Sequence, residues 1–231
     1  MKTSNATSNE GNGDDPVSRD VGNLREHYDN AELSHGDLDP DPIRQFDHWF
    51  REAQEADLSE PNAMVLATAG GDGTLTTRAV LLKAFDSRGF VFFTNYQSTK
   101  ARQIAENTGV AMNFLWLPLQ RQINITGTAE KVTTAESIKY FLSRPYGSQI
   151  GAWVSNQSSV ISSRKILQMK YEELKRKFRA GKVPIPDHWG GFRVNPRSIE
   201  FWQGLPNRLH DRFRYVRTEP DGEWTIERLA P

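Results

Sequence analysis

The first clear hydrophobic pattern in this chain is helical and begins after residue 41. Apolar side chains recur every three or four positions, as on a helix with one buried face. Asp41 is a favourable N-cap, and Pro42 is well tolerated at the first helical position. We therefore expect a helix that begins at Pro42 and packs one stripe into the core: Ile43, Phe46, Trp49, Phe50 and Ala53.

From residue 63 the period of the pattern shortens, and turn residues separate the apolar runs. This change predicts consecutive strands joined by hairpin-length links. Such a series of neighbouring strands favours an antiparallel sheet, most simply a barrel. The expected strands cover residues 63–69, 75–85, 90–95, 110–117 and 121–132.

Three further helices interrupt the strands. Ser98 is expected to cap a short helix that Gly109 ends. Thr133 and Glu136 have the spacing of a capping box and start a helix that Pro145 ends. An amphipathic helix is expected over residues 162–180, with Ile166, Leu167, Tyr171, Leu174 and Phe178 facing inward.

The last strands are expected at residues 191–194, 198–203, 208–217 and 224–229, so the fold class is α+β and mainly β. Residues 1–22 are rich in Asn, Ser, Thr, Gly and Asp and are expected to form a disordered polar tail. No linker divides the remainder, so residues 23–231 are expected to be a single domain.

Composition narrows the classes of partner and chemistry. The formal net charge of the 231 residues is zero, which argues against a nucleic-acid or membrane-surface partner. The absence of cysteine excludes disulfides and cysteine-ligated metals, and we assign no residue to a metal site. With no secretory pattern and no apolar run near the ~20 residues that span a bilayer, we expect a cytoplasmic protein.

The C-terminal stretch at residues 199–215, IEFWQGLPNRLHDRFRY, concentrates polar chemistry around a predicted hairpin. On a regular strand Arg208, His210 and Arg212 would share one face. Two guanidinium groups beside an imidazole suit an anion-facing surface. A solvated basic edge strand would explain the same pattern.

A second group of polar residues lies around the predicted break at Pro145. Tyr140 and Arg144 are four positions apart on one helix, and Ser148 follows the break. A guanidinium between two hydroxyls is suited to a phosphate monoester. Alternatively, Arg144 caps the carbonyl groups at the end of the helix.

The WQG and RLHDR motifs resemble the C-terminal signature of the pyridoxine 5'-phosphate oxidase family. Other matching motifs follow the same order along the chain: RAVLLK at 78–83, FTN at 93–95, RQ at 121–122, SRPxxSQIGAWVSxQSS at 143–159, WGGFRV at 189–194 and RLAP at 228–231. The resemblance implies an antiparallel split β-barrel that binds flavin mononucleotide (FMN) at the interface of a homodimer. It also implies oxidation of pyridoxine or pyridoxamine 5'-phosphate to pyridoxal 5'-phosphate, with dioxygen reoxidising the flavin and yielding hydrogen peroxide.

The resemblance further implies roles for individual residues. Lys83, Tyr140, Arg144 and Ser148 resemble the clamp on the substrate phosphate. Arg208 and His210 resemble the catalytic residues beside the substrate ring, and Arg25 and Tyr28 lie on a segment that resembles a cover over the substrate. The implied FMN contacts are Arg78, Lys83, Phe93, Thr94, Ser98, Thr99, Lys100, Gln122, Gln157, Ser158, Trp202 and Arg212.

Two features complicate the match. The family usually has Ser-Arg-Lys where this chain has Ser98-Thr99-Lys100, and loss of one charge-assisted contact is expected to cost about 1.5–3 kcal/mol of flavin binding. Arg78 and Lys83 would lie on opposite faces of a regular strand, so either a bulge intervenes or they serve different sites.

Two alternative functions remain open. One is a related flavin oxidase with another substrate, such as a phenazine-pathway enzyme, because a fold does not determine a substrate. The other is a non-catalytic module that binds polyanions through the basic segment RLHDRFRYVR.

Overall fold

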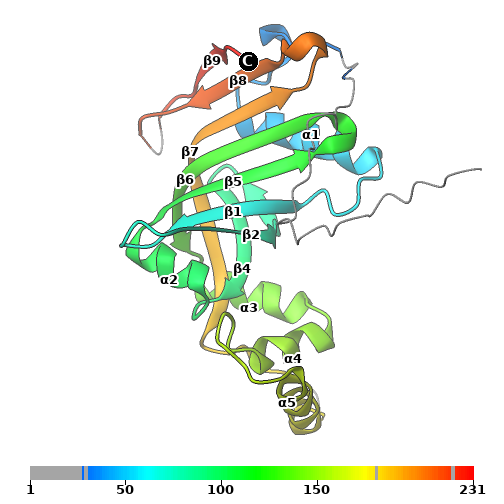
Figure 1. Ribbon diagram of the computed structural model, residues 1–231, viewed down its shortest axis with the longest axis vertical. Coiled ribbons are helices and arrows are strands. Elements are labelled where there is room, and N and C mark those ends of the chain that lie inside the picture. The colour runs from blue at the N-terminus through cyan, green and yellow to red at the C-terminus, as the bar shows by residue number, and fades with distance from the viewer. Residues whose placement is uncertain (1–27, 29–30, 180–181, 220–221) are drawn as a thin grey trace, which may run out of the picture.

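The computed structural model describes residue 28 and residues 31–179, 182–219 and 222–231. The predicted disordered tail at 1–22 and the candidate residue Arg25 lie outside this part of the chain. The described residues form one nine-stranded sheet in which every pair of neighbouring strands is antiparallel (Figure 1). Its path runs β2-β1-β5-β6-β7-β4-β3, and β8 and β9 extend it from β7.

The strands are β1 (Ala63–Ala69), β2 (Leu75–Leu81), β3 (Ala84–Asp86), β4 (Gly89–Asn95), β5 (Gly109–Trp116), β6 (Arg121–Lys131), β7 (Trp189–Gln203), β8 (Asp211–Val216) and β9 (Thr225–Leu229). The helices are α1 (Pro42–Glu55), α2 (Thr99–Glu106), α3 (Thr134–Ser143), α4 (Tyr146–Val154) and α5 (Arg164–Lys177). Short 3₁₀ turns cover His35–Asp37, Leu117–Leu119 and Pro206–Arg208.

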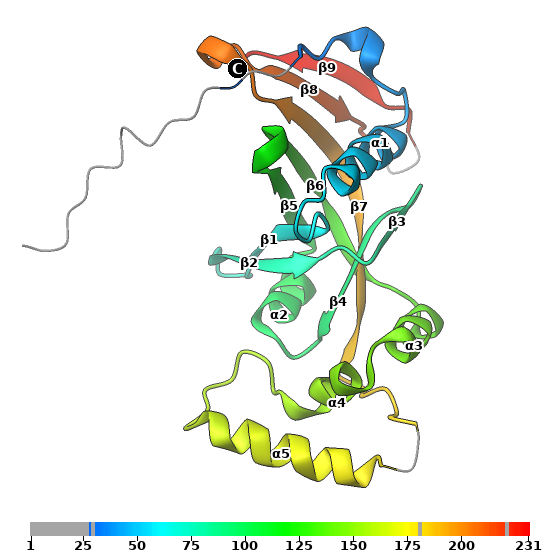
Figure 2. The ribbon, with the colours of Figure 1, turned by 90° about the vertical axis from the view of Figure 1, so that its right-hand side faces the viewer.

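The core forms where the sheet curls around α1 (Figure 2). As predicted, Asp41 caps this helix and Pro42 occupies its first turn. The ring of Phe46 is fully buried and contacts Phe85 of β3, Phe90 of β4 and Phe114 of β5. These strands are not all neighbours in the sheet, so a single side chain reaches them only because the sheet curves. Burial of each such ring contributes about 1.5–3 kcal/mol.

The strand predicted at 75–85 is two strands. The backbone N–H of Leu82 donates to Asn62 O, beside β1, whereas the N–H of Lys83 donates to Val91 O in β4, both at 2.8 Å. The chain therefore changes its pairing partner between these two residues. This break, and not a bulge within one strand, separates Arg78 from Lys83.

The strands predicted at 191–194 and 198–203 are one strand, β7, which passes through Pro196. Proline lacks the N–H that a regular ladder needs and is tolerated at irregular pairing. Here Pro196 lies opposite Gly127, where the register between β6 and β7 shifts. A Cβ at Gly127 would lie 2.1 Å from Asn195 O, so glycine is required at this close approach.

The prediction for residues 208–217 was wrong at its start. Arg208 belongs to the 3₁₀ turn at Pro206–Arg208 and has φ +63°, and β8 begins only at Asp211. Arg208 and His210 consequently do not share a strand face with Arg212. The positive φ of Arg208 turns the chain, so side chains before Asp211 do not alternate between two strand faces. The apolar pattern of the sequence does not report such a turn.

The helices differ from prediction in three places. Asn107 is the extended C-cap of α2, and Gly109 begins β5 instead of ending the helix. The helix α4 was not predicted. The helix α5 is shorter than expected, and Ile166 is 47% exposed although it was expected to face inward. Along the described part of the chain, none of the helices combines the length and apolar character that a membrane crossing needs.

Candidate functional site

Several predicted site residues line one open pocket beside α3 and α4, which we call the anion pocket. Its volume is about 640 Å³. From the predicted substrate clamp the lining includes Lys83, Tyr140, Arg144 and Ser148. From the predicted FMN set it includes Lys83, Phe93, Thr94, Lys100 and Gln157. The fold thus brings the whole predicted clamp together with five of the twelve predicted FMN contacts, from β4 and α2 on one side and α3 and α4 on the other.

Tyr140 projects from the last turn of α3, whose start is fixed by the predicted capping box of Thr133 and Glu136. Its ring stacks on Phe93, with centroids 4.0 Å apart, and lies 6.1 Å from Trp189 at an interplanar angle of 12°. Burial raises the pKa of Tyr140, although the charge of Arg144 acts in the opposite direction. The phenol is therefore a neutral hydrogen-bond donor at neutral pH.

Arg144 is the C-cap of α3 and has extended backbone geometry. Its guanidinium carbon lies 4.7 Å from the centroid of the Trp189 ring. Burial lowers the pKa of Arg144, but a guanidinium remains charged at neutral pH. Its Nη1 atom is buried and has no hydrogen-bond partner. Among the described side chains, Gln45 Nε2 is the other buried polar atom without a partner.

A buried cationic donor without a partner is costly, and an anion in the pocket would supply the missing acceptor. The alternative prediction, that Arg144 caps the carbonyl groups of α3, does not account for the unpaired Nη1 atom. The anion pocket is therefore suited to a phosphate or carboxylate group.

A second cation lies deeper in the same pocket. Lys100 is 8% exposed, and its Nζ lies 3.1 Å from Thr94 Oγ1, 3.1 Å from Gln157 Oε1 and 3.4 Å from Ser98 Oγ. Burial, and then the positive charge of Arg78, lower the pKa of Lys100 to about 8. Ser98 also caps α2, so the positive end of that helix adds to the attraction for an anion.

The other predicted FMN residues near α2 lie around the pocket and outside its lining. The N–H of Thr99 donates to Ser158 Oγ at 3.3 Å. Arg78 Nη1 donates to Leu66 O at 3.0 Å and to Thr68 Oγ1 at 2.7 Å, so β1 holds this side chain. The effect of Arg78 on the pKa of Lys100 shows that its charge still acts in the pocket.

The remaining predicted residues form a separate group, the C-terminal cluster: Tyr28, Gln122, Trp202, His210 and Arg212. Sheet register places Gln122 opposite Trp202, and Trp202 opposite Arg212. The imidazole of His210 lies 4.6 Å from the ring of Trp202 and 5.8 Å from that of Tyr28. These five residues and Arg208 are not part of the anion pocket lining.

The environment of His210 defines its protonation. Burial, and then the charge of Arg208, lower the pKa of His210. Its Nδ1 accepts a hydrogen bond from the N–H of Leu205 at 3.1 Å. The imidazole is therefore neutral at pH 7 with its proton on Nε2. Arg212 is held by Glu200 Oε1 and Ala230 O, each at 2.8 Å.

The strand β7 separates the two groups. Trp189 at its start lines the anion pocket, and Trp202 near its end belongs to the C-terminal cluster. The path between them along the strand is roughly 40 Å at about 3.3 Å per residue. Figure 1 shows α3 and α4 at one end of this strand and β8 and β9 at the other.

Sequence reasoning missed two residues that shape the anion pocket. Trp189 supports both Tyr140 and Arg144, and Asn95 Nδ2 donates to Ser155 O at 3.1 Å to hold the segment after α4. Both residues lie in motifs that had been noticed, WGGFRV and FTN. The two motifs therefore contained the signal, although only Phe93 and Thr94 of FTN were predicted to be site residues.

Comparison with protein families gives two matches. The family described as "Pyridoxamine 5'-phosphate oxidase" matches residues 50–178. The "Pyridoxine 5'-phosphate oxidase C-terminal dimerisation region" matches residues 189–231. A protein from Crocosphaera subtropica named pyridoxine/pyridoxamine 5'-phosphate oxidase is 62% identical over 213 residues, which cover 92% of this chain and 100% of that protein.

Two solved structures share the fold. PhzG from Burkholderia lata 383, in complex with tetrahydrophenazine-1-carboxylic acid, has a TM-score of 0.83 and 29% identity and covers 89% of this chain and 100% of its own. A pyridoxamine 5'-phosphate oxidase-related, FMN-binding protein from Nostoc punctiforme has a TM-score of 0.65 and 14% identity, with coverage of 82% and 97%. The predicted antiparallel split β-barrel is confirmed.

Proposed function

This chain belongs to the pyridoxamine 5'-phosphate oxidase family, and we propose that it oxidises pyridoxine 5'-phosphate and pyridoxamine 5'-phosphate to pyridoxal 5'-phosphate with FMN as its cofactor. Such an enzyme serves vitamin B6 salvage. The observation that carries the proposal is the buried, unpaired Nη1 of Arg144 in a pocket that Lys83 and Tyr140 also line. These groups match a phosphate monoester in charge and in hydrogen-bonding capacity.

The donor chemistry of the pocket also fits the phosphate of FMN. Lys100, Thr94 and Ser98 would hold that phosphate, with the start of α2 behind them. Gln157 and the hydroxyl of Ser158 lie at the same end of α2 and would add polar contacts. Lys83 and Phe93, which line the same pocket, would add further FMN contacts.

The residues assigned to the flavin ring from the other side belong to the C-terminal cluster. A strand path of roughly 40 Å along β7 is too long for one FMN molecule to contact both groups within a single chain. A homodimer solves this problem, because a second copy can bring its own C-terminal cluster to the anion pocket. The match of residues 189–231 to a dimerisation region supports this arrangement.

When bound, FMN would supply the redox chemistry: it would accept a hydride from the substrate C4' carbon as the alcohol or amine loses a proton, and dioxygen would take up two electrons and two protons to give hydrogen peroxide. For the amine substrate, water would hydrolyse the resulting imine to the aldehyde and release ammonia. Lys83, Tyr140, Arg144 and Ser148 would bind the substrate phosphate, and this remote binding energy would orient the reacting carbon. Arg208 and the Nε2–H of His210 would face the substrate ring from the partner subunit.

The test is aerobic incubation of the purified protein with FMN and pyridoxine 5'-phosphate, following formation of pyridoxal 5'-phosphate. We expect product only when FMN is present. The Arg144→Ala variant should retain FMN and lose most turnover at low substrate concentration. Bound FMN without product from the unaltered chain would contradict the substrate assignment, and failure to bind FMN would contradict the cofactor assignment.

A phenazine-type oxidase is the second candidate because PhzG has the same fold and 29% identity. The buried Arg144 and the nearby Lys83 favour a phosphorylated substrate instead. Parallel assays with a dihydrophenazine carboxylic acid and with pyridoxine 5'-phosphate separate the two. Arg208→Ala should reduce turnover of the phosphate substrate while FMN stays bound.

Several sequence expectations stay predictions. They are the single domain over residues 23–231, the cytoplasmic location, the lack of a metal site, and the lack of nucleic-acid and membrane partners. Polyanion binding that falls steeply with salt and occurs without FMN would favour the non-catalytic alternative.

A further inference from the structure

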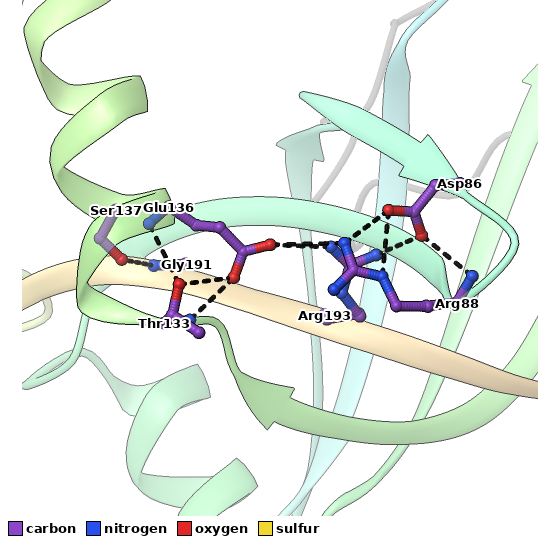
Figure 3. Close-up of polar contacts among 7 residues, drawn as sticks. All are labelled: Asp86, Arg88, Thr133, Glu136, Ser137, Gly191 and Arg193. Carbon is purple, nitrogen blue, oxygen red and sulfur yellow. Dashed lines mark hydrogen bonds and ion pairs between the residues drawn. The ribbon is translucent and has the colours of Figure 1, made fainter.

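A buried guanidinium outside the anion pocket connects β3, which directly follows Lys83, to α3, which carries Tyr140 and is capped by Arg144 (Figure 3). Arg193 lies in β7, and its side chain is 8% exposed. Its Nη1 donates to Asp86 Oδ1 at 2.6 Å, and its Nη2 donates to Glu136 Oε1 at 3.2 Å. Asp86 is the last residue of β3, and Glu136 lies in the first turn of α3.

The contact with Asp86 bears on the position of Lys83. Lys83 immediately precedes β3, which has three residues and, among the described strands, pairs with β4 alone. So short an edge strand has few ladder hydrogen bonds to resist movement. The bond from Arg193 fixes the far end of this strand to β7, and the Lys83 N–H to Val91 O bond fixes the near end.

The contact with Glu136 bears on Tyr140 and Arg144. The carboxylate of Glu136 accepts from both the N–H and the Oγ1 of Thr133, each at 2.9 Å, and so caps α3 while it pairs with Arg193. The N–H of Gly191 adds a second attachment by donating to Ser137 Oγ at 3.4 Å. Because a helix is stiff, a fixed first turn determines where Tyr140 and the C-cap Arg144 lie.

The network contains two carboxylates and two guanidinium groups, so it is electrically balanced only with Arg193 present, and without it Arg88 would be the one cation left. Arg88 Nη2 lies 2.8 Å from Asp86 Oδ2 and 3.6 Å from Glu136 Oε1, so both carboxylates retain a cation when Arg193 is replaced. Burial alone would raise the pKa of Asp86, but bonds from Arg88 and the charge of Arg193 hold it below its usual value. Bonds from Thr133, and then from Arg193, likewise lower the pKa of Glu136. Both groups are therefore ionised at neutral pH.

We propose that Arg193 is a positioning residue that sets the spacing between Lys83 and the Tyr140–Arg144 pair, and thereby the affinity of the enzyme for the substrate phosphate. This inference rests on the proposed function. A buried ion pair is weak evidence for a role in stability, since apolar replacements of similar volume are often tolerated. The contacts of Arg193 with Asp86 and Glu136 instead join two parts of one binding site, so we assign them a role in positioning.

The test uses Arg193→Met in the full-length protein loaded with FMN. We expect the KM for pyridoxine 5'-phosphate to rise about tenfold, while kcat and the Kd for FMN change less than twofold. Arg193→Lys keeps the charge but not the two-pronged geometry, so its KM should fall between those of the unaltered chain and Arg193→Met. An unchanged KM in Arg193→Met would overturn the proposal, and so would equal losses in KM, kcat and FMN affinity.

Arg214→Met is the control for the loss of a paired arginine contact elsewhere in the sheet. Arg214 forms a comparable paired contact with Glu227 Oε2, at 3.0 and 2.6 Å, between β8 and β9, and it is absent from the anion pocket lining. Because the Arg214 side chain is 42% exposed, against 8% for Arg193, its replacement should lower the Tm less than Arg193→Met does, and it should leave the KM unchanged. An equal rise of KM in both variants would assign the effect to general destabilisation and overturn the proposal.

Glu136→Gln gives an independent test if Arg193→Met does not fold. It weakens the Arg193 contact and should raise the KM by itself. Where Arg193→Met does fold, the two effects should not multiply in the double variant. Multiplicative effects, or no effect of Glu136→Gln, would overturn the proposal. If the unaltered chain fails to oxidise pyridoxine 5'-phosphate, the proposed function fails. If the unaltered chain is active and the Arg193 and Glu136 variants have the same KM as that chain, the positioning role fails and the proposed function stands.

Discussion

The ring of Tyr140 stacks on the ring of Phe93, with centroids 4.0 Å apart and planes 24° from parallel. One residue comes from α3 and the other from β4, so the stack joins the helical wall of the anion pocket to the sheet. Trp189 extends the stack from β7, 5.4 Å from Phe93. The position of the Tyr140 hydroxyl is thus determined by aromatic packing and not by the hydroxyl's own contacts.

This arrangement allows the hydroxyl to be removed without loss of the stack. Tyr140→Phe should raise the KM for pyridoxine 5'-phosphate about tenfold or more, because one hydrogen bond to a charged group contributes about 1.5–3 kcal/mol. Its Tm and FMN affinity should be unchanged. Tyr140→Leu, which also loses the stack, should lower the Tm. Steady-state kinetics measures the KM values, and thermal melts measure the Tm values. Equal KM values for the unaltered chain and Tyr140→Phe would contradict a contact between the Tyr140 hydroxyl and the substrate phosphate.

The lowered pKa of Lys100 predicts how FMN affinity depends on pH. Because this pKa is about 8 in the protein without ligand, the ammonium that faces the FMN phosphate is lost as the pH rises through 8. FMN affinity, measured by flavin fluorescence, should therefore fall between pH 7 and 9. Lys100→Met should bind weakly and show a flatter profile over this range. A profile equally steep in both proteins would assign the titration to another group.

The lowered pKa of Lys100 should make the folding stability of the protein without FMN rise with pH, whereas FMN affinity falls. Unfolding returns the pKa of Lys100 toward about 10.4, so between pH 8 and 10 the unfolded chain binds a proton that the folded chain does not. The Lys100 contribution to folding stability should rise across this window. Denaturant melts should show a rise for the unaltered chain relative to Lys100→Met, and parallel curves would count against a shifted lysine.

Restoring a guanidinium at position 99 should tighten FMN binding. Thr99 begins α2 beside Ser98 and Lys100, and its N–H contacts Ser158. Thr99→Arg should lower the Kd for FMN about tenfold, as expected for one charge-assisted hydrogen bond. Arg102, whose Nη2 lies 3.3 Å from Thr99 Oγ1, would repel the new cation and limit the gain. Thr99→Gln is the neutral control, and equal Kd values for the two variants would argue against a phosphate contact here.

Subunit mixing tests whether the site is shared between two chains. Arg144→Ala and Arg208→Ala should each be nearly inactive as homodimers. In a heterodimer of the two, both changes fall in one site and the other site is intact, so an equal co-expressed mixture should recover about a quarter of full activity. No recovery in a heterodimer purified with two tags would place Arg144 and Arg208 in a site built from one chain.

Two glycines with positive φ allow the cost of a steric clash to be separated from the cost of the backbone conformation. Gly89 begins β4 with φ +124°, and an added Cβ would lie 2.0 Å from Val194 O. Gly73, in the hairpin between β1 and β2, has φ +82° and open space around it. Gly73→Ala should cost about 1–2 kcal/mol of unfolding free energy from its backbone alone. Gly89→Ala should cost clearly more in denaturant melts, and equal costs would show that the β4–β7 contact relaxes freely.

Local features of this protein were readable from the sequence because they depend on neighbours along the chain. The Asp41 cap, the apolar stripe of α1, and the capping box of Thr133 and Glu136 all arise within one or two helical turns. The hairpin of β1 and β2 likewise follows from the turn residues between its strands. The sequence motifs also identified most residues of the anion pocket, although not how they meet.

Only the tertiary structure decided where pairing partners change. Leu82 and Lys83 bond to different strands, Arg208 turns the chain at a positive φ, and Arg193 joins β3 to α3. Apolar periodicity cannot report these events, since it records which face of an element is buried and not which distant segment covers it. The resemblance implied a site at the interface of two chains, but the sequence could not show which residues each chain supplies. The length of β7 decides this, because it sets the anion pocket and the C-terminal cluster apart within one chain.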